Sequence, residues 1–274
     1  MAKYPATLVI SIYKDIAKLR TILSALAIQT DKEFEIIVSE DGNAAEVATF
    51  LQPYRQQLPQ FVHLSQADQG FRKNRALNRA IVAARSDMLI FVDGDCVPHP
   101  RFIAAHKQHA KINTVCAGRR VELGPIFSRQ LIDQPEFLLR LANPWRYLAL
   151  ARAMHYDHIK NYEFGLFLPL VHRLAGRRPI HLVGSNFSCS RFLLEKINGF
   201  NEDFNSPGIG EDSDLEWRLK AAGGEIMNIK HLAVQYHLHH QRSYTVSERN
   251  KQIMAHAMKE NAWRCAQGLE QAKT

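Results

Sequence analysis

The 274-residue chain lacks the signals of several large protein classes. It has no run approaching the roughly 18 consecutive apolar residues of a membrane span, so we expect no transmembrane helix. Its N-terminus leads straight into a strand-like segment and lacks the layout of a signal peptide. No Cys-x-x-Cys pair occurs among its four cysteines, Cys96, Cys116, Cys189 and Cys265. This favours reduced thiols in a cytoplasmic protein over disulfides or a zinc site.

Two further absences narrow the function. The net charge is +8, yet the chain shows neither zinc-finger spacing nor an RNA-binding aromatic signature, so we expect no nucleic-acid partner. The segment 11–14 contains no glycine, whereas a sugar-phosphate nucleotidyltransferase typically carries a glycine-rich phosphate loop at this point; that class is therefore disfavoured. No repeat, low-complexity tract or linker interrupts the chain, which predicts a single domain over residues 1–274.

Apolar, strand-like segments alternate with helix-like segments in the first half of the chain. The pattern predicts strands at 6–12, 34–39, 61–64 and 88–92, with helices near 19–26, 44–57 and 71–85. This alternation is typical of a parallel, doubly wound α/β sheet. Residues 119–182 are less regular, with helical stretches around 136–155, and regularity resumes at His181-Leu182-Val183-Gly184. A polar, basic helix is expected at 247–269.

Asp93-Gly94-Asp95 follows the apolar run 88–92, which reads as a strand buried on both faces. Carboxylates at the end of such a strand project into the crevice where open α/β sheets bind ligands. Two oxygen donors separated by a glycine suit Mg²⁺ or Mn²⁺, and therefore a substrate diphosphate. The alternative is an ordinary Asp-Gly turn.

Asp41 ends the second predicted strand, at the same sheet edge if the sheet is parallel. There it can accept a hydrogen bond from a base or a ribose; the alternative is a turn aspartate before Gly42.

Gly70 precedes a helix that begins with Arg72, Lys73 and Arg75. Cations in a first turn oppose the helix dipole, which makes sense beside a bound diphosphate. The alternative is a solvated basic face.

Two later clusters carry chemistry. Glu211 and Asp212 precede a helix whose Ser213 and Asp214 suit capping, and one of the first two is a candidate general base. In a strand, His237 and His239 share one face, and with His240 they are candidate metal ligands or structural histidines.

The order of these motifs resembles the family 2 glycosyltransferases of the GT-A fold. The resemblance rests on the segments Leu8–Lys14, Phe34–Gly42, Asp93–Asp95 and, most specifically, Gly184–Ser188 through Asn198–Phe204 to Gly210–Asp214, which is similar to the C-terminal half of galactosyltransferase-type members.

The resemblance implies an α/β GT-A fold, with a mostly parallel central sheet flanked by helices and a helical insertion. It divides the domain into a nucleotide-sugar-binding half (1–118), a basic helical insertion (119–182), a catalytic and acceptor half (183–246) and a C-terminal helix (247–274). It also implies an inverting transfer of a hexose or N-acetylhexosamine from a UDP-sugar to a hydroxyl of a glycan or lipid-linked acceptor, in surface polysaccharide or lipopolysaccharide assembly. A sugar-nucleotide-binding protein without transferase activity is the remaining alternative.

The resemblance also implies residue roles. Asp95 and His237 would bind Mn²⁺ or Mg²⁺, with Asp93 acting through a ribose or a metal-bound water; His239 and His240 remain open as ligands. Asp212 would be the base and Glu211 would orient the acceptor. Leu77 stands where the family often has an arginine, so Arg75 or Arg72 would take the phosphate role, and Lys14 replaces an asparagine. The donor would contact Ser11, Tyr13, Asp41, Arg72, Lys73, Arg75, Asn78, Asp93 and Gly94, and the acceptor Gly184, Asn186 and Trp217.

The segment 119–182 carries ten Arg and Lys residues against five Asp and Glu residues. A solvated surface is the simplest interpretation of such a patch. Aromatic and apolar residues interleaved with the arginines favour an anionic glycan or an acidic membrane surface, and hence a cytoplasmic protein peripheral to the inner face of the cell membrane. The residues concerned are Arg119, Arg120, Arg140, Arg146, Arg152, Phe137, Leu139 and Trp145.

Overall fold

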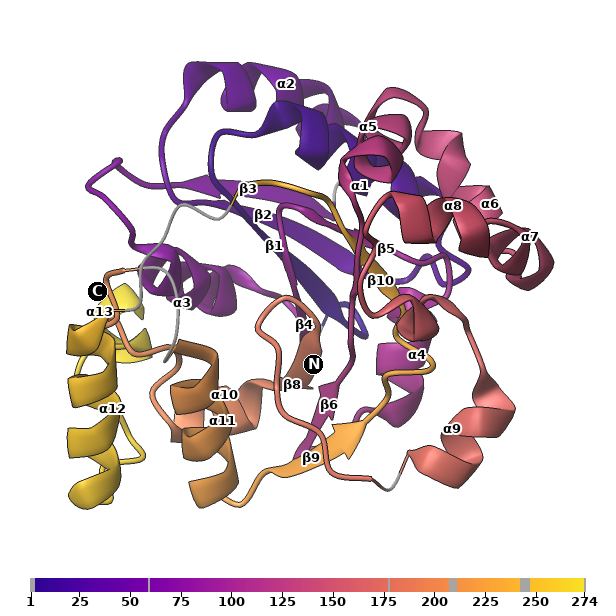
Figure 1. The fold of residues 1–274 in the computed structure, drawn as a ribbon. Coiled ribbons are helices and arrows are strands. Elements are labelled where there is room, and N and C mark those ends of the chain that lie inside the picture. Colours follow the sequence, from indigo (N-terminus) through magenta and orange to yellow (C-terminus); the bar gives the residue numbers. More distant parts are fainter. Residues whose placement is uncertain (1–2, 59, 177, 207–210, 242–246, 274) are drawn as a thin grey trace.

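A seven-stranded sheet forms the centre of the computed structural model, which describes residues 3–58, 60–176, 178–206, 211–241 and 247–273. The strand order is β3-β2-β1-β4-β8-β6-β9 (Figure 1). Five strands come from the first 117 residues: β1 (Thr7–Ile12), β2 (Glu35–Glu40), β3 (Phe61–Ser65), β4 (Met88–Asp93) and β6 (Thr114–Ala117). The other two are β8 (Phe187–Ser190) and β9 (Glu225–Asn228). The predicted mostly parallel α/β sheet is confirmed.

Strand direction changes only around β8. β1 pairs in parallel with β2 and β4, and β2 with β3, so these strands end at one edge. β8 runs antiparallel to both β4 and β6, and β6 pairs in parallel with β9. A second, three-stranded sheet has the order β5-β10-β7, with β5 (Cys96–Pro98), β7 (Val121–Glu122) and β10 (Gln235–His237). Because β5 follows β4 directly, the small sheet adjoins the end of the central strand.

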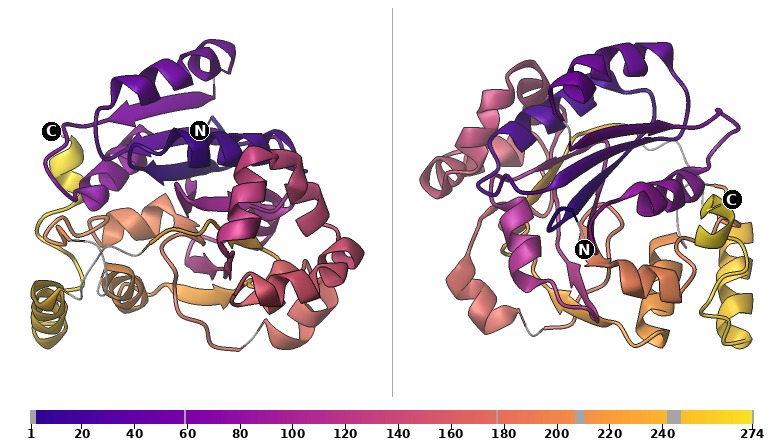
Figure 2. Two further views of the ribbon diagram at one scale, coloured as in Figure 1. Left: turned by 45° about the horizontal axis from the view of Figure 1, so that its top comes forward. Right: turned by 180° about the vertical axis from the view of Figure 1, so that it is seen from behind.

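Helices cover both faces of the large sheet (Figure 2). One side carries α1 (Ile16–Ala27), α2 (Ala45–Gln57) and α4 (Phe102–His109). The other carries α3 (Lys73–Ala83), α10 (Arg191–Lys196) and α11 (Glu211–Ala221). Asp15 caps α1 by accepting a hydrogen bond from the Lys18 backbone N–H. The predicted amphipathic spacing then buries Leu19, Ile22 and Leu26 against the sheet.

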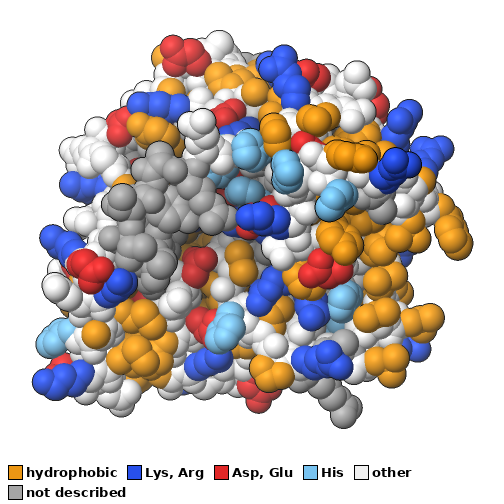
Figure 3. All heavy atoms as spheres, in the orientation of Figure 1, with side chains coloured by type: hydrophobic (Ala, Val, Ile, Leu, Met, Phe, Trp, Pro, Cys, Tyr) orange, Lys and Arg blue, Asp and Glu red, His pale blue; other side chains and the backbone are white. Residues whose placement is uncertain are grey.

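The segment 119–182 forms the helical insertion that the sequence predicted, and side chains of this part lie at the right of Figure 3. Its short helices are α5 (Pro125–Asp133), α6 (Leu138–Leu141), α7 (Pro144–Ala149), α8 (Ala151–Tyr156) and α9 (Pro169–Ala175), with 3₁₀ turns η1 (Pro135–Phe137) and η2 (Tyr162–Gly165). Prolines at the first positions of α5, α7 and α9 are compatible with helix starts but not with helix interiors, which explains why the helices are short. Among the described residues, no helix is both long and apolar enough to span a bilayer.

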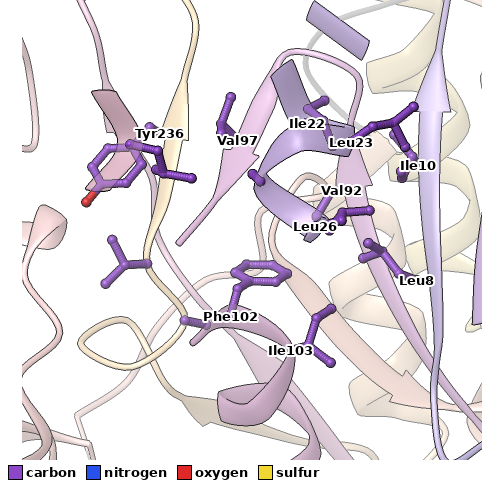
Figure 4. Packing of buried hydrophobic residues seen from close by; sticks show 14 of the residues in the cluster. Leu8, Ile10, Ile22, Leu23, Leu26, Val92, Val97, Phe102, Ile103 and Tyr236 are labelled. Carbon is purple, nitrogen blue, oxygen red and sulfur yellow. The ribbon is translucent and has the colours of Figure 1, made fainter. Parts of the chain in front are cut away.

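Alternate residues of each central strand enter different cores. Leu8 and Ile10 of β1 lie in the core under α1 and α4, whereas Val9 lies in the core under α3. Figure 4 shows the first core, where Val92 of β4 packs near Leu26 and Phe102. Burial on both faces is what the continuous apolar runs predicted.

Two segments differ from the regular elements that the sequence pattern suggests. The segment 181–184, where the pattern becomes regular again, is neither helix nor strand, and its backbone N–H groups at Leu182 and Gly184 donate to the α11 carboxylates Glu216 and Asp212. The expected helix at 247–269 is two helices, α12 (Glu248–Lys259) and α13 (Leu269–Lys273). α12 ends because Asn261 adopts a left-handed φ of 51° and turns the chain back towards α10.

Candidate functional site

The ends of β1 and β4 lie side by side, since Ser11 pairs with Asp93 in the parallel register. The Gly94 backbone N–H donates to the Ser11 carbonyl at 2.6 Å. A Cβ at Gly94 would lie 2.8 Å from that oxygen and 2.8 Å from Ile12 Cγ2. Only glycine allows this approach, so the residue between the two aspartates fixes both carboxylates at the edge of the sheet.

A cavity of about 560 Å³ opens at this edge. It is lined by the loops after β1, β2 and β4 and by the starts of α1 and α3, through Ser11, Ile12, Tyr13, Asp15, Lys18, Asp41, Gly70, Phe71, Lys73, Asp93, Gly94, Asp95 and His240. Seven of the predicted donor and metal residues therefore come together in one place: Ser11, Tyr13, Asp41, Lys73, Asp93, Gly94 and Asp95.

Asp41 is buried and joins three loops of this cavity. Its Oδ1 accepts from Gln66 Nε2 at 2.8 Å, and its Oδ2 accepts from the Arg72 backbone N–H at 2.7 Å. These bonds attach the loop after β3 and the start of α3 to the end of β2. Each carboxylate oxygen has a second lone pair, so a ligand donor can still be accepted.

Two histidines face Asp95. Its Oδ2 lies 3.4 Å from His237 Nε2 and 3.1 Å from His240 Nε2, while Cys96 Sγ donates to Oδ1 at 3.2 Å. Burial disfavours a charged Asp95, but the contacts with His237 and His240 outweigh it and hold the pKa of this carboxyl below its usual range. The contact with Asp95 raises the pKa of His240 above its usual value.

The donor atoms around Asp95 suit a divalent cation. Asp95, Cys96 and His237 place one ligand atom each within 4.8 Å of one another. Burial raises the pKa of the Cys96 thiol well above its usual value, so this residue remains a protonated hydrogen-bond donor. The remaining carboxylate and imidazole groups form a set that fits Mn²⁺ better than a soft, thiolate-binding metal.

Lys73 connects this cavity to Asp212. Its Nζ lies 2.8 Å from Asp93 Oδ1, and its side chain also lines a small cavity with Gly184 and Asp212. The Gly184 N–H donates to Asp212 Oδ2 at 2.9 Å, and a Cβ at Gly184 would lie 2.2 Å from Asp212 Oδ1. Burial raises the pKa of Asp212 above its usual value, although the Lys73 cation opposes this shift.

Comparison with known proteins agrees with this geometry. The family model described as "Glycosyl transferase family 2" matches residues 7–171, well over half of the chain. The chain belongs to glycosyl transferase family 2. A second model, "N-terminal domain of galactosyltransferase", matches residues 178–241, which include Asp212 and His237. Both matches agree with the resemblance seen in the motifs.

Curated relatives of this family 2 protein are distant and longer. Validoxylamine A glucosyltransferase of Streptomyces hygroscopicus subsp. jinggangensis is 27% identical over 233 residues, covering 79% of this chain and 51% of the relative. Chondroitin synthase of Pasteurella multocida is 23% identical over 216 residues, covering 71% of this chain and 20% of the relative. The chain thus spans about half, or less, of the length of these two relatives.

Solved structures share the fold. A mannosyltransferase from Pyrobaculum calidifontis, in complex with GDP-Man and Mn²⁺, superimposes with a TM-score of 0.55 at 16% identity, covering 88% of this chain and 59% of that one. S. aureus TarS residues 1–349, in complex with UDP, gives a TM-score of 0.59 at 14% identity, covering 97% and 68%. The GT-A fold is therefore confirmed.

Two asparagines predicted to contact ligands lie in the interior of the enzyme fold. Asn78 is buried; it accepts from the Phe200 N–H and donates to the Phe200 carbonyl and Glu202. Asn186 is buried and donates to the carbonyls of Arg119 and Ala233. Their amides satisfy backbone groups of distant segments, which leaves them unsuited to the donor and acceptor roles expected of them.

The predicted arginines also lie elsewhere. The Arg72 and Arg75 side chains line a separate cleft of about 260 Å³ with Glu202 and Asp203, on the side of α3 away from the donor cavity lining. Lys73, which lies between them in the sequence, is the basic residue of α3 that reaches Asp93. Successive helix residues point about 100° apart, so Lys73 faces a different direction from Arg72 and Arg75, which lie three residues apart on one side of α3.

Other expectations fall outside the cavity or outside the described residues. Trp217 is half-buried on α11 and is not among the residues that line the donor cavity. The Glu211 side chain lies outside the described part of the structure, so its role stays a prediction. β10 ends at His237, and His239 is exposed, so the two histidines do not share a strand face. His240, beyond the strand end, faces Asp95 instead.

Sequence reasoning missed two cations at the site. Lys18, in the first turn of α1, lines the donor cavity beside Asp15. Arg120, which the sequence grouped with a surface patch, donates to Ser185 Oγ at 3.1 Å. Burial disfavours its charge, but Cys96, Asp93 and Asp95 raise the pKa of Arg120, which places this cation among the site carboxylates. Its position just before β7, a strand of two residues, gave no recognisable sequence signal.

Proposed function

We propose that the protein transfers a hexose or N-acetylhexosamine from a UDP-sugar to a hydroxyl of a glycan or lipid-linked acceptor, with inversion at the anomeric carbon. The observation that carries this proposal is that Lys73 lies between two carboxylate sites, Asp93 and Asp95 at the end of β4 and Asp212 on α11. Asp93 and Asp95 can hold a nucleotide diphosphate through a cation, and Asp212 can accept a proton.

The donor would lie in the cavity at the ends of β1, β2 and β4. Asp41 and Tyr13 would contact the nucleoside. Both line the cavity and follow β2 and β1, whereas Asp95, which His240 faces, follows β4 at the other end of this strand order. Asp95, His237 and His240 would hold Mn²⁺ or Mg²⁺, with Asp93 reaching a ribose or a metal-bound water. A bound cation would offset the charge of the departing diphosphate. Lys73 and Lys18 would add positive charge on the same side.

Asp212 would act as the base. As the acceptor oxygen attacks the anomeric carbon, its proton would pass to Asp212, the new C–O bond would form, and the bond to the diphosphate would break, releasing UDP. The raised pKa of Asp212 makes it a stronger proton acceptor than an exposed aspartate. The Gly184 N–H would hold the carboxylate in position. By analogy with the polysaccharide-synthesising relatives, surface polysaccharide or lipopolysaccharide assembly is the proposed setting.

The test is turnover of a panel of UDP- and GDP-sugars, with and without Mn²⁺, in wild type and in Asp212→Asn. We expect one UDP-sugar to be turned over with Mn²⁺, and Asp212→Asn to lose about 10²–10⁴-fold in kcat, because the amide cannot accept the proton. UDP binding, measured by calorimetry, should persist in this variant.

Asp203→Asn is the matched control, because Asp203 is exposed and lines the separate cleft. It should keep wild-type turnover. Near-normal turnover by Asp212→Asn would show that another group is the base, and binding of UDP-sugars with no turnover in any condition would favour a binding protein over a transferase.

A further inference from the structure

Large apolar side chains protrude from the insertion. Trp145 is 80% exposed and Leu174 is 88% exposed, values that no folding requirement explains. Figure 3 shows apolar side chains gathered with basic ones over the region of α5 to α9. Other exposed members of this group, each at least half exposed, are Ile126, Leu139, Leu148, Tyr156, Tyr162 and Leu170.

The apolar residues on the inner side of the insertion pack into the core of the main domain. Leu138, Leu141, Tyr147 and Met154 are buried and belong to the core that also contains α1. The same short helices therefore carry buried apolar residues on one side and exposed ones on the other. Exposed apolar side chains grouped on one part of a molecule mark a surface that binds something.

Three exposed arginines are interleaved with the protruding residues: Arg140, Arg146 and Arg152. One of the acidic residues of the segment, Asp157, is buried, because its carboxylate caps α5 by accepting from the Ile126 and Phe127 N–H groups. Asp157 therefore adds no negative charge to the exposed surface around these arginines. We call the exposed set Leu139, Arg140, Trp145, Arg146, Leu148, Arg152, Tyr156, Leu170 and Leu174 the insertion face.

The structure also refines which residues of the segment belong to such a surface. Phe137 is buried in the core, and Arg119 donates to the carbonyls of Gly118 and His181. Arg120 lies among the site carboxylates. These three residues, grouped with the patch on sequence alone, have other partners.

We propose that the insertion face docks on the surface of an anionic lipid bilayer. Trp and Leu tips on short helices suit insertion at the headgroup boundary, and arginines beside them can keep their charge at the level of anionic headgroups. A protein partner would be expected to meet a flatter apolar area with its charges at the rim, whereas here charges and apolar tips alternate along α6 to α8.

This docking would place the catalytic site next to the bilayer. The Ser128 hydroxyl of α5 accepts a hydrogen bond from the His239 backbone N–H at 2.7 Å. In the sequence, His239 lies between His237 and His240, the two histidines that face Asp95. α5, which belongs to the same insertion as the insertion face, thus contacts the segment that carries His240, a residue of the donor-cavity wall. Resting on the proposed function, this geometry assigns a lipid-linked molecule, presented from the membrane, as the acceptor.

The test is flotation of the full chain with phosphatidylcholine vesicles, with and without phosphatidylglycerol. Binding is expected only with the anionic lipid and should weaken as salt rises. Trp145→Glu should reduce binding roughly tenfold or more, since it removes a large apolar side chain from the boundary. R140Q/R146Q/R152Q should reduce it roughly a hundredfold, at about 1 kcal/mol for each cation.

Two controls are matched to these variants. Phe192→Glu removes an exposed aromatic residue on α10, and R249Q/K251Q/K259Q removes three exposed charges on α12; neither should change vesicle binding. Equal binding to neutral vesicles, or equal losses in the controls, would overturn the proposal. So would a dimer that Trp145→Glu dissociates without any change in vesicle binding, since the face would then bind a second copy.

Donor turnover in solution separates this proposal from the catalytic one. Trp145→Glu should turn over the UDP-sugar at the wild-type rate without vesicles, because its side chain projects into solvent. Asp212→Asn should bind vesicles as wild type does. Absence of turnover in every protein would defeat the proposed function and leave the vesicle result standing on its own.

Discussion

At the scale of single residues, two glycines determine where the carboxylates of the site lie. Gly94 allows the loop after β4 to contact the Ser11 carbonyl, and Gly184 allows the chain before β8 to contact Asp212. Neither Gly94 nor Gly184 has a positive φ. Their contribution is therefore the absence of a Cβ and the close backbone approach that this absence permits.

Gly184→Ala tests this role. The new Cβ would lie 2.2 Å from Asp212 Oδ1, so the carboxylate must move while the donor cavity on β4 stays intact. We expect kcat for sugar transfer to fall on the order of a hundredfold, because small displacements of a catalytic group are costly. Steady-state kinetics and UDP calorimetry measure this.

UDP affinity should be unchanged in Gly184→Ala. A loss of UDP affinity as large as the loss of kcat would mean that the substitution disturbs the whole fold rather than the base.

At the scale of elements, the sequence predicted what depends on local pattern. The strands β1, β2 and β4 are largely apolar runs, and the helices between them have apolar residues at helical spacing, so their positions and their common edge could be inferred. The Asp93-Gly94-Asp95 edge followed from the parallel order of those strands. These predictions needed no knowledge of contacts between distant segments.

Contacts between distant segments explain what could not be predicted. Asn78 and Asn186 are polar residues close in sequence to the motifs, and both have their amides bonded to backbone groups far along the chain. A pattern of residue types cannot distinguish a buried structural amide from a ligand-binding one. Likewise, Lys73 rather than Arg75 reaches Asp93 because of the phase of α3 relative to the sheet.

Asn78→Ala measures this structural role at the junction of α3 and the Asn198–Phe200 turn. It removes three side-chain hydrogen bonds and leaves the Phe200 backbone groups without their buried partner. The free energy of unfolding should fall by about 2 to 4 kcal/mol. Urea denaturation measures this, and Gln56→Ala, on the exposed side of α2, is the control that should show no change.

A donor-binding asparagine would behave differently. If Asn78 contacted the nucleotide, its replacement would raise KM for the donor at a temperature where the variant is fully folded. We expect KM to stay at the wild-type value there.

At the scale of the whole molecule, buried histidines join its layers. His106 of α4 contacts Ser188 Oγ of β8 at 2.9 Å and Asn186 Oδ1 at 3.2 Å. His99, after β5, stacks on Phe167 of the insertion with ring centroids 6.0 Å apart. Burial lowers the pKa of His106 to about 3 and that of His99 to about 4. Both are therefore neutral in the folded protein at pH values where an unfolded histidine is charged.

These histidines make the fold sensitive to acid. Because their pKa values are lower in the folded state, the unfolded chain binds more protons as the pH falls below about 6.5, and stability is lost between that pH and the folded pKa values. From pH 7 to pH 5, each should lower the free energy of unfolding by about 2 kcal/mol. Urea denaturation at both pH values measures the total change, and His106→Gln should make it smaller by about 2 kcal/mol, since glutamine keeps hydrogen-bonding capacity without titrating. His155→Gln, on the exposed surface of α8, should leave the pH dependence intact. An unchanged pH dependence in His106→Gln would mean that the acid sensitivity arises elsewhere, and that the joint between α4 and β8 does not titrate on unfolding.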